Sequence, residues 1–135
     1  MVSLRSKPKD NVTITVRSSD TAEGMANRTN IKFDKENWNS VKTVTVTGVN
    51  YNVTDGDKKY LIYLEPDTNT DDAVYNDLDP DDVELVNIDD ETAGFTINTT
   101  DATSTETGDT ATFLVRLNSE PMDNVTVYVV NDDKT

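Results

Sequence analysis

Short runs in which apolar and polar residues alternate occur along most of the chain. In Val12–Val16 the aliphatic side chains point to one face and the threonines to the other, and Val44–Thr47 repeats this pattern. Tyr60–Leu64 is a continuous apolar run, which is typical of a central strand. Further strands are predicted at residues 31–33, 83–88, 95–97, 111–117 and 125–129.

Turn-forming residues separate these runs, and the pattern indicates an all-β chain. Asp55-Gly-Asp57 and Thr107-Gly-Asp109 are typical turns. Asp79–Asp82 predicts one isolated helical turn, with Asp79 as N-cap and Pro80 next. Strands spaced at roughly ten residues predict an antiparallel Greek-key β-sandwich of immunoglobulin-like type. The predicted core is Val12, Ile14, Val16, Phe33, Val44, Val46, Leu61, Tyr63, Leu85, Val115 and Val127.

The two ends of the chain resemble each other. When residues 4–22 are aligned with residues 117–135, an offset of 113 positions, nine of nineteen positions are identical, among them Pro8 with Pro121 and Asn11 with Asn124. A period of this size fits tandem sandwich domains. We therefore expect residues 1–93 to form most of one repeat without its first strand, in a chain excised from a longer array, and residues 94–135 to open the next repeat.

Such a division leaves strand edges without partners. Residues 95–117 carry the strand that the first repeat is expected to lack. They could fold back to complete the sandwich of their own chain, or insert into a neighbouring molecule as a strand swap. The high effective concentration of an intramolecular partner favours fold-back.

The composition excludes several binding partners and several kinds of functional site. The chain has 26 acidic and 12 basic residues, a net charge of −14, no Cys and no His. This charge repels nucleic acid and anionic membranes, and no apolar run is long enough to insert into a membrane. Disulfides, thiolate or imidazole metal sites and Ser-His-Asp triads are excluded. Carboxylates are plentiful, but glycosidase chemistry needs a cleft lined with aromatic residues, and these make up only 7% of the chain, so we do not expect an enzyme.

Acidic residues gather at predicted strand ends. Asp55-Gly-Asp57 and Asp89-Asp-Glu91 each place carboxylates close together, and calcium prefers such oxygen ligands on flexible loops. The alternative is that these are solvated turn acids in an acidic protein. The acids at residues 71–72 and 77–82 are interpreted as surface residues.

Three stretches resemble a Calx-beta domain, a sandwich module of sodium–calcium exchangers and of large bacterial surface proteins. Val44–Leu64 resembles its strand, acidic loop and strand. Val86–Phe95 resembles its closing strand and acidic linker, and Thr105–Val115 resembles its first strand with a glutamate. The pattern from Phe33 through Trp38 to Val44 is similar to that of bacterial arrays.

The resemblance implies a calcium site at one end of the sandwich. By matching motifs, its ligands would be Asp20, Asp55 with Asp57, Asp89 and Asp90, while Glu106, beside Asp133, would serve the second repeat. Two departures from the Calx-beta pattern remove negative charge from this calcium site. Residues 50–52 read Asn-Tyr-Asn where aspartates usually stand, and the first repeat lacks the counterpart of Glu106. Because calcium affinity depends on ligand charge, we expect a weak site or none.

Two functions fit these observations. The leading hypothesis is a structural repeat of a stalk or adhesin type, secreted or on the cell surface, whose partners are neighbouring repeats. The alternative is a module that binds a glycan or a protein through its end loops, which an exposed Trp38 between Asn37 and Asn39 would support. Trp38 could instead close one end of the sandwich.

Overall fold

The computed structural model describes residues 1–132 and divides the chain into two units. Unit 1 comprises Met1–Asn50 and Asp57–Ile88, and unit 2 comprises Tyr51–Gly56 and the chain from Asp89 onward. Residues 51–56 therefore belong with the second half of the chain, although the sequence alone places them inside the first repeat.

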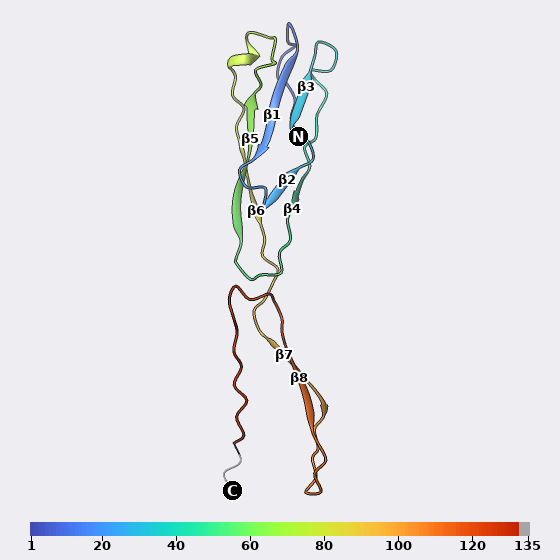
Figure 1. The fold of residues 1–135 in the computed structure, drawn as a ribbon. Helices are drawn as coiled ribbons and strands as arrows, with labels where there is room; N and C mark the ends of the chain where they lie inside the picture. Colours follow the sequence, from blue (N-terminus) through green and yellow to red (C-terminus); the bar gives the residue numbers. More distant parts are fainter. Residues whose placement is uncertain (133–135) are drawn as a thin grey trace. The chain divides into compact units, whose positions relative to one another are not determined.

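Unit 1 is an antiparallel β-sandwich, as the strand pattern predicts (Figure 1). One sheet has the strand order β3-β1-β5-β6, with β1 at Val12–Ser18, β3 at Asn30–Phe33, β5 at Lys58–Pro66 and β6 at Val83–Asn87. The other sheet pairs β2 (Gly24–Ala26) with β4 (Val46–Gly48). Successive strands from β1 to β5 alternate between the two sheets, so the connections cross from one layer to the other.

The core lies between these two sheets. It is formed by Leu4, Val12, Ile14, Val16, Ile31, Phe33, Tyr60, Ile62 and Leu64. The predictions for Val12, Ile14, Val16 and Phe33 are confirmed, and Val44, Val46 and Leu85 are half-buried and pack against this cluster.

The predicted inward face of β5 is wrong. Tyr60, Ile62 and Leu64 are buried, whereas Leu61 and Tyr63 lie on the other face and are half-exposed. Five consecutive apolar residues contain no alternation, so the sequence cannot distinguish the two faces. The pairing of β5 with β1 determines which face of β5 is buried. Val16 is buried and lies opposite Leu64, and directly opposed residues of a sheet share a face.

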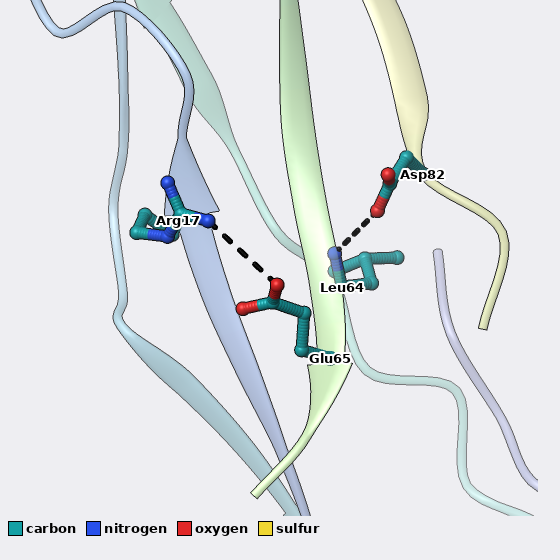
Figure 2. A network of polar contacts seen from close by, with 4 residues as sticks. All are labelled: Arg17, Leu64, Glu65 and Asp82. Carbon is teal, nitrogen blue, oxygen red and sulfur yellow. Dashed lines mark hydrogen bonds and ion pairs between the residues drawn. The ribbon is translucent and has the colours of Figure 1, made fainter. Parts of the chain in front are cut away.

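Two polar contacts hold the edges of β5 (Figure 2). The amide of Leu64 donates to Oδ1 of Asp82 at 3.0 Å, which extends the β5–β6 pairing beyond the start of β6. On the outer face, Arg17 forms a 3.7 Å ion pair with Glu65, and its guanidinium lies 4.4 Å from the ring centroid of Tyr63. The ring of Tyr63 therefore contacts a cation on the outer face instead of packing in the core.

The short helical turn is at a different position from the predicted one. It is a 3-10 helix, η1, at Tyr75–Asp77, and residues 79–82 have no helical structure. The amides of Val74 and Tyr75 donate to Oδ1 of Asp72, which stabilises the start of this turn. The buried carboxylate of Asp72 therefore takes the capping role that the sequence suggests for Asp79, and the turn forms earlier in the chain.

Unit 2 contains a β-hairpin formed by β7 (Phe95–Asp101) and β8 (Thr112–Leu117). Its register pairs Phe95 with Leu117 and Ile97 with Val115, with an irregularity between Thr99 and Asp101. The segment 51–56 joins this unit through a parallel bridge between Val53 and Glu120.

Two core predictions fail in unit 2. Val115 and Val127 are 43% and 51% exposed, and residues 125–129 form no strand. The same pattern is strand β1 in unit 1, where β3 and β5 flank it. Alternation alone therefore does not produce a strand when the described residues of unit 2 offer this segment no ladder partner.

Candidate functional site

The carboxylate of Asp89 connects two turns within unit 2. Its Oδ2 accepts hydrogen bonds from the amides of Asp55 and Gly56, at 2.9 and 2.7 Å, and its Oδ1 accepts the amide of Glu91 at 3.0 Å. Gly56 has a φ of 78°, which a residue with a Cβ adopts at a cost. The Asp-Gly sequence thus presents two successive amides to one carboxylate.

The pKa values of Asp89 and Glu91 in this turn are shifted in opposite directions. The hydrogen bond from Gly56, followed by that from Glu91, lowers the pKa of Asp89 because both stabilise the ionised form. Partial loss of hydration, and next the negative charge of Asp90, raise the pKa of Glu91. The turn therefore holds one carboxyl group whose pKa is lowered and one whose pKa is raised.

The other predicted ligands belong to several elements of the two units. Asp20 is in unit 1, in the turn between β1 and β2, and its Oδ1 accepts the amide of Ala22 at 2.9 Å. Asp57 is also in unit 1, directly before β5. Glu106 is exposed in the loop between β7 and β8, and Asp133 lies outside the described residues.

The carboxylates around Asp89 do not form the cluster of oxygen ligands that calcium requires. In the part of the chain that the structure describes, no group of three or more acidic side chains could hold a metal ion. Calcium takes six to eight oxygens, as a typical range. Both oxygens of Asp89 already accept backbone amides. The residues of this turn do not fit a calcium site as they stand, and calcium binding stays a prediction.

One carboxylate that the sequence placed at the surface is buried. Asp72 is 3% exposed, and it accepts the amides of Lys9 and Asp10 through Oδ2 and those of Val74 and Tyr75 through Oδ1. The interpretation of Asp72 as a surface acid is therefore wrong. These hydrogen bonds, that from Lys9 first, lower its pKa. The Asp-Asp pair at 71–72 gave no signal for this, because the amides of Lys9 and Asp10 come from a segment far away in the sequence.

Trp38 is half-buried and packs against the core of unit 1. Its carbonyl oxygen accepts the amide of Leu4 at 3.1 Å. Its position corresponds to an aromatic that closes the sandwich rather than to an exposed platform for a sugar ring.

Comparison with known proteins adds no relative. No family model, no curated protein and no solved structure matches this chain. Among residues 1–132, no helix is long and apolar enough to cross a membrane.

Proposed function

We propose that this chain is a structural repeat module of a secreted or cell-surface protein, of the kind that builds stalks and adhesins, and that it has no catalytic role. The observation that carries the proposal is the internal repeat. The first copy of the repeated motif supplies β1, which lies between β3 and β5 in the sandwich of unit 1.

Two further features support this function. Asp89 accepts hydrogen bonds from the amides of Asp55 and Gly56, so the turn at 55–56 and the segment that begins at Asp89 are held together within unit 2. The resemblance to Calx-beta domains, which occur in large surface proteins, points to the same class. The partners proposed are neighbouring repeats.

The location can be tested on intact cells of the source organism. An antibody raised against the 135-residue chain should label unpermeabilised cells or the culture medium, and protease added outside should remove the signal. A cytosolic protein of known abundance serves as the leakage control. Antigen found only after permeabilisation would contradict the proposal.

A further inference from the structure

Asp55-Gly56 is the only Asp-Gly dipeptide in the chain, and the sequence contains no Asn-Gly. In an Asp-Gly dipeptide the amide nitrogen of the glycine can attack the side-chain carboxyl of the aspartate, because no glycine side chain stands beside the attacking atom. Both residues are exposed. Apart from its chain neighbours, no described residue places an atom within 4 Å of the position that a Cβ of Gly56 would occupy. Packing around Gly56 therefore does not block the attack.

The reaction at this dipeptide would convert aspartate to isoaspartate with water as the only co-reactant. First, the nitrogen of Gly56 forms a bond to Cγ of Asp55, and the amide proton leaves with the hydroxyl of the carboxyl group as water. A cyclic imide results. A water molecule then adds to the main-chain carbonyl of Asp55, and the bond from that carbonyl carbon to the nitrogen of Gly56 breaks. In the product the main chain runs through Cβ and Cγ of residue 55 and is longer by a methylene group.

Closure of the imide ring requires one particular rotation about the Cα–C bond of Asp55. The nitrogen of Gly56 must lie on the side of Cβ in order to reach Cγ. The amide nitrogen of Asp55 is a different substituent of the same tetrahedral Cα. A single rotation therefore cannot bring both Cβ and this amide nitrogen beside the nitrogen of Gly56.

The hydrogen bonds to Asp89 hold the rotation that prevents ring closure. Its Oδ2 accepts the amides of Asp55 and Gly56, at 2.9 and 2.7 Å. Two successive amides reach one oxygen only when their nitrogens lie on the same side of the Cα–C bond, which turns the nitrogen of Gly56 away from Cβ. Because the acceptor is a carboxylate, its negative charge also opposes the loss of the amide proton that the attack requires.

The carboxylate of Asp89 is itself held in place. Its second oxygen, Oδ1, accepts the amide of Glu91 at 3.0 Å, and the side chain is half-buried. Asp55, Gly56 and Asp89 all belong to unit 2. The contacts that restrain the Asp-Gly dipeptide therefore lie within one compact part of the chain.

We propose that Asp55-Gly56 is a site of isoaspartate formation, and that the carboxylate of Asp89 suppresses this modification as long as the turn is closed. Opening of the turn lets the nitrogen of Gly56 rotate toward Cγ of Asp55. After the reaction, the longer main chain no longer directs both amides to one oxygen. The modification thus removes the hydrogen bonds that protected the dipeptide, and the turn stays open.

Incubation of the full chain at neutral pH and physiological temperature, followed by peptide mapping, tests the proposal. A protease that cleaves before aspartate leaves isoaspartate uncut, and fragmentation by electron transfer locates the product at residue 55. Isomerisation leaves the peptide mass unchanged, which distinguishes it from deamidation of an asparagine. The product should form at least about tenfold more slowly in the native chain than in urea, because a hydrogen bond to a charged acceptor shifts an equilibrium by about this factor.

Substitutions at the acceptor separate its effect from that of folding in general. In the native chain, Asp89→Ala should raise the rate to nearly that in urea, whereas Asp90→Ala, at the exposed neighbouring position, should retain the wild-type rate. Asp89→Asn keeps one acceptor oxygen and should react more slowly than Asp89→Ala. The double variant Asp55→Ala/Asp89→Ala lacks the carboxyl group that is attacked and should give no product at residue 55.

Amide exchange along β8 checks that Asp89→Ala opens the turn and leaves the β7–β8 hairpin paired. If the hairpin opens as well, the wild-type rates with and without urea and the rate of Asp89→Asn still decide. Equal rates for the native and the unfolded wild type would overturn the proposal. So would equal rates for Asp89→Ala and Asp90→Ala, or for Asp89→Ala and Asp89→Asn.

The inference concerns chemistry within unit 2 and does not rest on the proposed function. Antigen found only inside cells would leave the isomerisation rates unaffected. Equal rates in all variants would leave the location at the cell surface unaffected.

Discussion

Several aspartate side chains of this acidic chain accept hydrogen bonds from backbone amides of loops and turns. Asp72 accepts four amides and Asp89 three, while Asp20 and Asp67 close tighter local turns. In a chain without disulfides or metal ligands from Cys and His, such carboxylates fix the loops that connect the strands. The acidity therefore has a structural use in addition to solubility.

The inner face of β5 can be tested with two neighbouring substitutions. Ile62→Ala should lower the free energy of unfolding by about 2–5 kcal/mol, because it removes a side chain from a packed core. Leu61→Ala, on the half-exposed face, should cost about 1 kcal/mol. Urea unfolding followed by Trp38 fluorescence measures both. A larger effect of Leu61→Ala would mean that β5 is inverted relative to the structure.

The buried carboxylate of Asp72 predicts a pH dependence of stability. Its pKa is lowered in the folded state, so its stabilisation is present above the unfolded pKa, near 3.8, and is lost as the pH falls through the lower folded value. Asp72→Asn should lower stability at neutral pH and flatten the acid limb of the stability curve.

Asp71→Asn, at the exposed neighbouring position, is the matched control and should change neither. Asp67, Asp89 and Asp101, whose pKa values are also lowered, contribute to the slope that remains. An unchanged acid limb in Asp72→Asn would show that its hydrogen bonds do not form in solution. Urea midpoints measured between neutral and acidic pH give the comparison.

At the scale of elements, the strands differ in how far their sequences determine them. Val12–Ser18 alternates and is a strand with a buried face. Gly24–Ala26 has no strand signal and is nevertheless β2, because it pairs with β4 and its glycine lies against the side chain of Tyr60. Residues 125–129 alternate as well as β1 does and form no strand. Pairing partners, which are distant in sequence, decide both exceptions.

Substitutions in the turn around Asp89 distinguish a structural role of this carboxylate from a role in calcium binding. Asp89→Ala should accelerate amide hydrogen exchange at Asp55 and Gly56, whether calcium or a chelator is present, because these amides lose their acceptor. Asp90→Ala should leave the exchange at both amides unchanged. Exchange measured by NMR in millimolar calcium and in excess chelator gives the comparison.

A calcium site would give a different pattern. Calcium at about a hundred times its Kd would stabilise the folded chain by roughly 2.7 kcal/mol. Both Asp89→Ala and Asp90→Ala would abolish that shift in melting temperature, and Asp81→Ala would not. Identical melting curves in calcium and in chelator would exclude calcium from this turn.

At the scale of the whole molecule, apolar surface is distributed unequally between the two units. Among the described residues, all buried core side chains lie in unit 1, whereas the apolar side chains of β7 and β8 are exposed. A sandwich repeat is stable only when both sheets cover each other. The apolar face of the β7–β8 hairpin is therefore less covered than the core of unit 1.

The sequence by itself determined the fold class and most of the alternating strands, because these depend on local periodicity. The tertiary structure decided the inner face of β5, the strand β2, the burial of Asp72 and the grouping of residues 51–56 with unit 2. Each of these depends on contacts between segments far apart in the sequence. For the candidate site, the sequence located the acidic turns, and the structure showed that the carboxylate of Asp89 accepts backbone amides there.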